Sequence, residues 1–238
     1  MKSQAIVLRS IKYNDDTLIV HLLTAEMGCL GMSVKVSRSH RTAVRHTLFQ
    51  PLAVLDVAWD HRPKASLQRP KYAAVALPLV SLPYDPYKSA IALFLAEFLY
   101  YALRSEPYSR SVYDYIVHSV AWLDTCTHSF SNFHLVFLLR LARFLGFMPN
   151  VEDFAAGAWF DMRSATFVDQ QPLHSECLQP ADAALVPKLL RMRYETMHVF
   201  RFSGGERSRL LEQINLFYSL HLPGFPELKS LSVLKDLF

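Results

Sequence analysis

The sequence predicts an α+β chain of two parts, a small N-terminal β-barrel followed by a mainly α-helical domain. The first 60 residues contain short β-branched and apolar runs separated by turn signals about every 8–12 residues, as in a small barrel. From Tyr84 onward, apolar residues recur at helical spacing instead. Hydrophobic residues make up 51% of the 238 residues, which is enough for a core and excludes a disordered chain. We therefore expect domains at residues 1–80 and 81–238.

The strands expected in the first 60 residues lie at residues 5–8, 17–24, 29–36 and 48–59. In the third of them, Met32, Val34 and Val36 alternate with polar residues, the period of a half-buried strand. The following stretch, residues 62–83, contains four prolines and is interpreted as a connection with room for one last strand.

The helices expected in the second domain lie at residues 87–103, 111–123, 133–145, 182–193, 204–221 and 230–238. The segment 133–145 is apolar on nearly all sides, which predicts a central buried helix that Gly146 ends. Ser203 and Glu206 have the spacing of a capping box at the start of the helix at 204–221. Residues 147–181 are irregular, with strand character at 159–168.

Several classes of protein are excluded by what the sequence lacks. Its seven glycines form neither of the phosphate-binding loops G-x-x-x-x-G-K-[ST] and G-x-G-x-x-G, and G-x-S-x-G and H-E-x-x-H are absent. The three cysteines are far apart in the chain and predict no disulfide framework. No apolar run reaches the roughly 20 residues of a membrane span. We expect a soluble, cytoplasmic protein without a cofactor.

Positive charge is concentrated in the first third of the chain. Residues 1–80 contain eleven Lys or Arg against five Asp or Glu, whereas the remainder contains fourteen against sixteen. Two windows without any acidic residue, 27–55 and 61–84, hold eight of those eleven cations. Such a distribution is typical of a protein that binds a polyanion. The alternative is a solvated basic face that binds nothing.

Three short patterns are candidates for a metal, catalytic or peptide-binding site. His174 and Cys177 have no second pair of ligands nearby, so an ordinary loop is favoured over zinc. Cys29 lies in a strand pattern without an evident base, which favours a packed cysteine over a nucleophile. Arg140 and Arg143 share one face of an apolar helix. They either support the fold or form a basic rim for an acidic, hydrophobic peptide.

The N-terminal part contains the segments Ala5–Ser10, Tyr13–Asp16, Leu22–Thr24, Met27–Gly28, and Lys35–Arg45 followed by Leu48–Leu52. In combination with the segments below, these resemble the RecO family of bacterial recombination mediators. Further along, Leu138–Phe147 is similar to the leucine-rich helix of that family. The most specific match is the ending Tyr218–Phe225 with Leu228–Ser230 and Leu234. The resemblance extends over nearly the whole chain.

The resemblance implies a five-stranded OB-fold at residues 1–80 and a non-enzymatic function in DNA repair. Such proteins bind single- and double-stranded DNA, anneal complementary strands, work with RecR and help to load RecA. An OB barrel with basic loops can follow a phosphate backbone. The expected phosphate contacts are Lys35, Arg38, Arg41 and Arg45, followed by Arg62, Lys64, Arg69 and Lys71. By family analogy, the acidic C-terminal tail of the single-stranded-DNA-binding protein is expected to contact Arg140 and Arg143. A nucleoid-associated location follows.

One departure from the family pattern concerns metal. Many members carry a four-cysteine zinc module after the leucine-rich helix, but residues 147–181 contain only Cys177. We expect no metal, with Phe154, Trp159, Phe160 and Phe167 forming the local core in its place. The alternative function is a protein-only adaptor whose helical domain binds acidic, hydrophobic peptides and whose basic face has no role with DNA.

Overall fold

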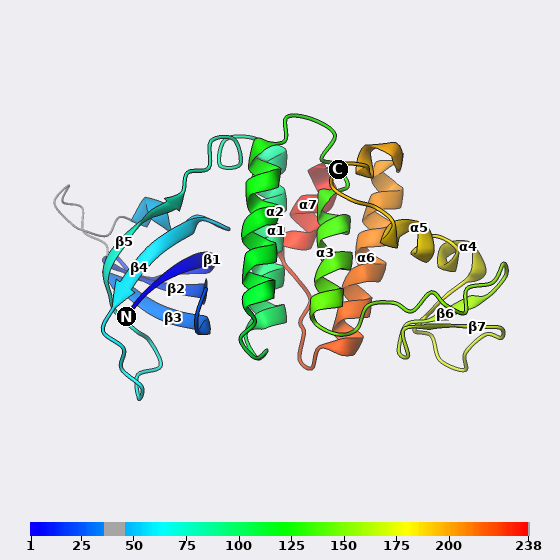
Figure 1. Ribbon diagram of the computed structural model, residues 1–238, viewed down its shortest axis with the longest axis horizontal. Coiled ribbons are helices and arrows are strands. Elements are labelled where there is room, and N and C mark those ends of the chain that lie inside the picture. Colours follow the sequence, from blue (N-terminus) through cyan, green and yellow to red (C-terminus); the bar gives the residue numbers. More distant parts are fainter. Residues whose placement is uncertain (36–45, 238) are drawn as a thin grey trace. The chain divides into compact units, whose positions relative to one another are not determined.

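The computed structural model describes residues 1–35 and 46–237 (Figure 1). These residues separate into two compact units. The first unit contains Met1–Thr125 together with the C-terminal segment Leu228–Leu237, and the second contains Cys126–Glu227. No helix in the described ranges combines the length and apolar character that crossing a membrane requires.

An antiparallel sheet of five strands forms the N-terminal part of the first unit, in the spatial order β3-β2-β1-β4-β5 (Figure 1). Its strands are β1 (Lys2–Asn14), β2 (Thr17–Thr24), β3 (Gly28–Lys35), β4 (Val54–Trp59) and β5 (Pro70–Leu77). The long strand β1 is central because its start pairs with β4 while the residues from Ala5 onward pair with β2.

The sheet closes on itself where the chain before β5 returns to β3. Gln68 and Met32 form a parallel bridge. The N–H of Ser33 donates to the carbonyl of Gln68 at 2.8 Å, and the N–H of Gln68 donates to that of Gly31 at 2.9 Å. The enclosed core consists of aliphatic side chains and two aromatic ones, among them Val7, Val20, Leu22, Val34, Phe49, Leu55 and Trp59. The predicted α+β class with an OB-like five-stranded barrel is therefore confirmed.

The strand predicted at residues 48–59 is wrong in its first half. His46–Leu48 form a 3-10 helix, and β4 begins only at Val54. Leu52 has a φ of 60°, which an extended strand cannot adopt, and Pro51 before it has no N–H to donate. The apolar alternation there belongs to a turn, which hydrogen bonds between residues 52–53 and Val7 tie to β1.

Helices α1 (Pro86–Leu103) and α2 (Arg110–Thr125) complete most of the first unit. Pro86 begins α1, one residue before the predicted start, and the carboxylate of Asp85 caps the helix by accepting two backbone N–H groups. A last helix, α7 (Ser230–Leu237), packs against α1. It confirms the predicted C-terminal helix up to Leu237, beyond which Phe238 lies outside the described residues.

A buried carboxylate holds the connection between β5 and α1. Asp124 accepts the N–H groups of Val80, Ser81 and Leu82 at 3.0, 2.9 and 2.7 Å. Burial alone would raise the pKa of Asp124, but these three donors and nearby Lys88 hold it below its ordinary value. The connection between β5 and α1, which belongs to the proline-containing stretch 62–83, is thereby fixed to the end of α2.

In the second unit, α3 (Phe133–Phe144) and α6 (Gly204–His221) pack side by side (Figure 1). The prediction of a buried central helix is confirmed for α3, and Gly146, at a φ of 85°, follows its end. The predicted capping box is also present at the start of α6. The buried hydroxyl of Tyr218 joins the two helices by donating to the carbonyl of Leu138 at 2.7 Å.

The strand character predicted at residues 159–168 is confirmed by a second, three-stranded sheet. Its strands are β6 (Trp159–Asp161), β7 (Thr166–Val168) and β8 (Cys177–Leu178), in the order β7-β6-β8. Phe160 and Phe167 belong to its buried core, as expected. Trp159 is only half-buried and Phe154 remains 40% exposed, although its ring meets that of Phe167 edge-on at 5.1 Å.

The single helix predicted at residues 182–193 is wrong. Two short helices occupy this stretch, α4 (Pro180–Ala183) and α5 (Val186–Leu190). A continuous helix would need an N–H at position 187 to reach the carbonyl of Ala183, and Pro187 has none. The chain therefore breaks after α4 and restarts with Pro187 in the first turn of α5.

Candidate nucleic-acid interface

The loop between β4 and β5 carries three of the predicted phosphate contacts, and Gln68 organises it from inside. Gln68 is 3% exposed. Its Nε2 donates to the carbonyls of Arg62 and Ala65 at 2.9 and 3.1 Å, and its Oε1 accepts the N–H of Arg62 at 2.8 Å. Because the amide is fully engaged, it holds the backbone that carries Arg62 and Lys64 in one conformation.

Gly31 allows this loop to lie against β3. A β-carbon at position 31 would stand 2.8 Å from Cδ2 of Leu67 and 3.5 Å from the carbonyl of Ser66. A larger residue would therefore require the end of the Leu67 side chain to move, whereas its contact with the Ser66 carbonyl would be an ordinary van der Waals distance. Together with the backbone bonds of Gln68 to β3, this close approach sets the base from which the loop cations project.

The cations of this loop differ in what they face. Arg62, Lys64 and Arg69 are exposed, and no described residue forms an ion pair with them. Lys71 instead pairs with Asp60 at 2.7 Å, and its hydrogen bond lowers the pKa of that carboxyl. Both partners are well exposed, so the pair is weak and a phosphate can compete for Lys71.

Two further features lie near the same edge of the barrel. Lys35 is exposed at the end of β3, and because the bridge between Met32 and Gln68 is parallel, β3 and the chain leading to Arg69 run in the same direction. Tyr72, on β5, is 50% exposed and offers a ring on which a base can stack. The remaining predicted contacts, Arg38, Arg41 and Arg45, lie outside the described residues.

Comparison with known proteins covers both parts of the chain. Residues 1–76 match the family described as Recombination protein O N terminal, and residues 83–232 match Recombination protein O C terminal. The chain is 53% identical over 238 residues to a DNA repair protein RecO of Bacteroides fragilis, covering 100% of this chain and 98% of the relative. It is 52% identical over 237 residues to a protein of that name from Phocaeicola vulgatus, with the same coverage. The chain belongs to the RecO family.

Membership of the RecO family places this chain among DNA repair proteins and confirms the resemblance stated from its motifs. A third relative, the DNA repair protein RecO of Azobacteroides pseudotrichonymphae, is 40% identical over 237 residues and likewise covers 100% of this chain and 98% of its own length. The N-terminal barrel and the helical remainder of the chain therefore occur together in its relatives.

The two arginines predicted to meet a partner peptide occupy different surroundings on α3. The guanidinium of Arg140 lies over the ring of Tyr194, 5.2 Å from its centroid, and that ring stacks on Phe133 at 4.8 Å. Arg143 is exposed. Neither arginine lines the apolar cavity of about 40 Å³ beside Leu139, where the charged lining residue is Asp182. Arg140 thus has a packing role whether or not a peptide binds.

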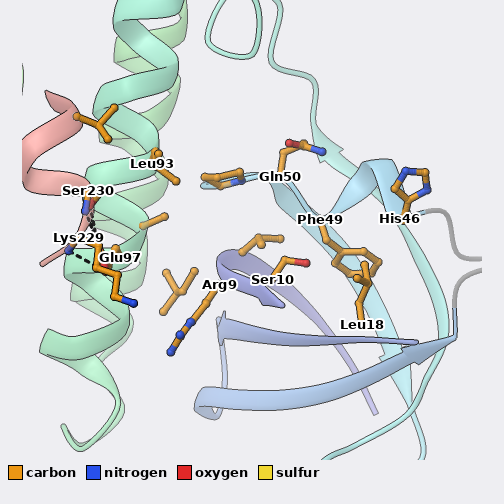
Figure 2. Close-up of a pocket in the computed structure, with 15 residues that line it drawn as sticks. Arg9, Ser10, Leu18, His46, Phe49, Gln50, Leu93, Glu97, Lys229 and Ser230 are labelled. Atoms are coloured by element: carbon orange, nitrogen blue, oxygen red, sulfur yellow. Dashed lines mark hydrogen bonds between the residues drawn. The ribbon is translucent and has the colours of Figure 1, made fainter. Parts of the chain in front are cut away.

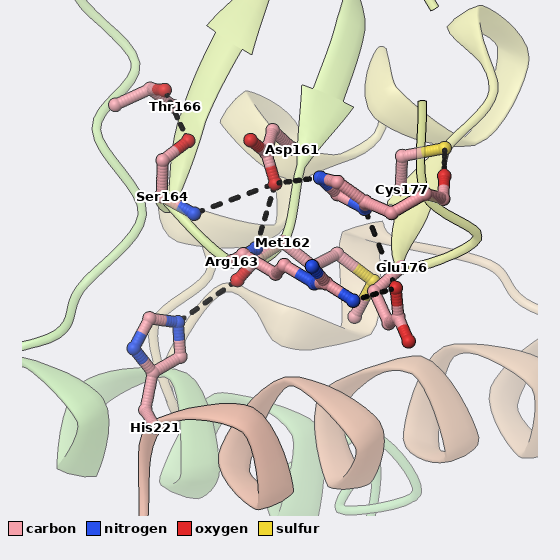
Figure 3. A network of polar contacts seen from close by, with 9 residues as sticks. Asp161, Met162, Arg163, Ser164, Thr166, Glu176, Cys177 and His221 are labelled. Carbon is pink, nitrogen blue, oxygen red and sulfur yellow. Dashed lines mark hydrogen bonds and ion pairs between the residues drawn. The ribbon is translucent and has the colours of Figure 1, made fainter. Parts of the chain in front are cut away.

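Residues 147–181, the stretch compared above with the zinc module of the family, contain a polar network (Figure 3). His174 lies between two carboxylates. Its Nε2 is 3.4 Å from Oδ1 of Asp161, and its Nδ1 is 3.4 Å from Oε2 of Glu176. Arg163 pairs with Glu176 at 2.8 Å, and the N–H of Arg163 donates to Asp161 at the same distance. Figure 3 shows the side chains of Arg163 and Glu176 meeting, with Asp161 beside them.

The residues of this segment do not fit a zinc site. Among the residues that the structure describes, no group of three or more His, Cys, Asp or Glu side chains is arranged to hold a metal ion. The thiol of Cys177 points to the carbonyl of His174 at 3.6 Å. Burial opposes ionisation of Asp161, yet the N–H groups of Arg163 and Ser164 lower its pKa. The carboxylate of Asp161 is thus already engaged by backbone donors of its own segment.

Cys29 is a packed cysteine. Its Sγ donates to the carbonyl of Leu103 at 3.4 Å, and burial raises its pKa to about 11. The thiolate needed for nucleophilic attack is therefore scarce at neutral pH.

Sequence reasoning missed the two residues that position this candidate interface. Gln68 and Gly31 are separated by 37 positions, and neither belongs to a recognisable motif. The one available signal was the isolated Gly31 inside a strand pattern, which indicates close approach of another backbone. Nothing in the local sequence distinguishes Gln68 from an exposed glutamine.

Proposed function

We propose that this RecO-family chain is a non-enzymatic recombination mediator that binds single- and double-stranded DNA and anneals complementary strands. With RecR it promotes RecA loading on DNA coated by single-stranded-DNA-binding protein. The supporting observation is a rigid loop that presents Arg62, Lys64 and Arg69 without intramolecular ion pairs among the described residues. Cations held in this state can neutralise phosphates without first breaking a salt bridge.

The proposal assigns separate roles to the two parts of the chain. Residues 1–80 form the DNA-binding domain, and residues 81–238 form the helical domain, with the segment at about 147–181 in place of the zinc module. The DNA contacts are Lys35, Arg38, Arg41, Arg45, Arg62, Lys64, Arg69 and Lys71. Arg140 and Arg143 receive the acidic tail of the single-stranded-DNA-binding protein, and the protein acts at the nucleoid.

A charge-matched pair of variants tests the DNA-binding role. The triple variant Arg62→Gln, Lys64→Gln, Arg69→Gln removes three unpaired cations, whereas Arg110→Gln, Arg163→Gln, Arg209→Gln removes three that are ion-paired. We expect only the first variant to lose affinity for a labelled 30-nucleotide strand, measured by fluorescence anisotropy at about 100 mM salt. Annealing of complementary strands should fall in parallel.

Equal loss in both variants would show that net charge alone attracts DNA and would contradict the assigned contacts. Absence of binding by the wild type at micromolar concentration would favour the protein-only adaptor, since even non-specific binders usually reach that range. For the peptide role, co-purification with single-stranded-DNA-binding protein should depend on its acidic tail. Binding that survives removal of the tail, or that Arg143→Glu leaves intact, would contradict that assignment.

A further inference from the structure

A pocket of about 590 Å³ lies within the first unit, between β1 and the helices α1 and α7 (Figure 2). Its walls include the apolar side chains of Leu8, Leu18, Phe49, Leu93 and Val233. Leu93 is 43% exposed and Val233 44%, so both present uncovered apolar surface. The volume lies in the range of about 300–1,000 Å³ that is typical of ligand-binding pockets.

Positive charge dominates the polar part of this pocket. Arg9 and Lys229 line it, and Figure 2 shows both on the side of α1 and α7, whereas His46 lies at the opposite side next to Phe49. The guanidinium of Arg9 lies over the ring of Tyr100 at 5.1 Å. No described carboxylate forms an ion pair with Arg9 or Lys229.

The acidic residue of the pocket, Glu97, is already engaged. Its carboxylate accepts the N–H of Ser230 at 2.8 Å and that of Lys229 at 3.3 Å, and it also accepts the hydroxyl of Ser230. Glu97 therefore caps the N-terminus of α7, where the helix dipole offsets its charge. An anion that enters the pocket meets two cations and one carboxylate that already accepts hydrogen bonds from Lys229 and Ser230.

A strand edge runs along the same pocket. The pairing of β1 with β4 ends at Ile6, and backbone hydrogen bonds with residues 52 and 53 continue only to Val7. From Arg9 to Asn14, β1 pairs with β2 on one side, with Leu8 at an irregularity in that pairing, and the described part of the chain places no strand on the other side. Leu8, Arg9 and Ser10 both belong to this edge and line the pocket. An unpaired edge is a template for a further strand.

We propose that this pocket is a docking site for an extended segment of a partner protein in which apolar and acidic residues alternate. The segment pairs with β1 at Leu8–Ser10. Because side chains of a strand alternate in direction, its apolar residues face the side of the pocket formed by Leu18 and Phe49, while its carboxylates face Arg9 and Lys229 on the side of α1 and α7. The site goes beyond the DNA contacts and the tail contacts of α3, and it does not depend on them.

A synthetic probe tests the site directly. We would titrate the full-length protein into a fluorescein-labelled Val-Asp-Val-Asp-Val-Asp-Val peptide and record anisotropy. The expected result is saturable binding that Arg9→Glu and Lys229→Glu each weaken by about tenfold. Lys2→Glu is the matched control, since Lys2 is an exposed cation on the same strand outside the pocket. We expect it to change the affinity by less than about twofold.

A second pair of variants and a hydrogen-exchange measurement separate this site from other modes of binding. Leu93→Asp should abolish binding, while Leu216→Asp, at the same 43% exposure on α6, should not. Bound peptide should slow amide exchange in residues 8–12, as strand pairing requires. Circular dichroism confirms that each variant is folded.

Several outcomes would overturn the proposal. These are no saturable binding by the wild type, equal binding by Arg9→Glu and wild type, equal binding of a Val-Lys peptide, or protection elsewhere than β1. Displacement of the peptide by an oligonucleotide would assign the pocket to DNA instead. The variant Arg62→Gln, Lys64→Gln, Arg69→Gln should bind the peptide normally, so failure of the DNA proposal would leave this one intact.

Discussion

Charged side chains in the two units face different partners. In the first unit, Arg62, Lys64 and Arg69 project from an ordered loop, and no described residue pairs with them. In the second unit, Arg163 pairs with Glu176 and Arg209 with Asp182. The same residue types therefore stay without ion pairs in this loop of the first unit and are paired at these positions of the second, although Lys71 and Arg110 of the first unit are paired as well.

This difference shows that net charge is a poor guide to binding unless the partners of each cation are known. The window of residues 61–84 contains no acidic residue, although Asp60 lies just before it, two positions from Arg62. Lys71 is still paired, because the register of β4 with β5 brings Asp60 beside it. Among the described residues, Arg62 has no ion pair because folding brings Asp60 to Lys71 instead, and Lys64 and Arg69 also have none.

The largest effect is expected where a charge is buried and fully engaged. Asp124→Ala leaves the N–H groups of Val80, Ser81 and Leu82 without their acceptor. We expect a loss of about 2–4 kcal/mol in the free energy of unfolding, measured by urea denaturation. Asp114→Ala, which breaks the exposed pair with Arg110, is the control and should change stability little. Similar losses in both variants would contradict the distinction between engaged and exposed charges.

Next in size is the effect of the unpaired cations on the salt dependence of DNA binding. In Arg62→Gln, Lys64→Gln, Arg69→Gln, the slope of log affinity against log salt should become shallower by about 2–3. The reason is that the phosphates neutralised by these three side chains no longer release their counterions when the protein binds. Anisotropy titrations at several salt concentrations measure this slope. An unchanged slope with lower affinity would mean that these side chains shape the loop rather than contact phosphate.

A smaller effect is expected in the polar network of the second unit. Asp161→Ala removes the acceptor for the N–H of Arg163 and the neighbour of His174. We expect about 1 kcal/mol of destabilisation, because the network is partly exposed. DNA affinity should stay at the wild-type value, and a decrease would show that the second unit also contributes to the interface.

The smallest effect is the loss of folding stability expected when the pH is lowered. Since the pKa of Asp124 is held below its ordinary value of 3.8 in the folded state, its contribution is complete above that pH and is lost as the pH falls through the folded pKa. As the pH falls below about 4, the wild type should lose more stability than Asp124→Ala. Parallel curves for the two proteins in urea denaturation at each pH would contradict the lowered pKa.

Much of the fold was predictable because its signals are local. The capping box of Ser203 and Glu206, the proline that begins α1 and the glycine after α3 all act within a few residues. The strand predicted at 48–59 and the helix predicted at 182–193 were wrong because the spacing of apolar residues was followed across a proline. Pro51 and Pro187 each lack the N–H that the predicted strand and helix needed.

The candidate interface was predictable only in part. Acid-free windows identified its cations, because charge composition is readable without a structure. The position of Gln68 against β3 was not, because a buried glutamine is recognised only by the backbone groups that fold around it. The packing of Arg140 on Tyr194 also depends on residues 54 positions apart.

The sequence by itself determined the order of the elements, the basic first third and membership of the RecO family, because propensity, composition and motif similarity are properties of the chain. Only the tertiary structure decided which cations are free, and it alone assembled the pocket between β1 and α7. Arg9 and Lys229 are 220 residues apart and share that pocket because Glu97 anchors the last helix to α1. Contacts of that separation are selected by packing and hydrogen-bond satisfaction, which no local pattern encodes.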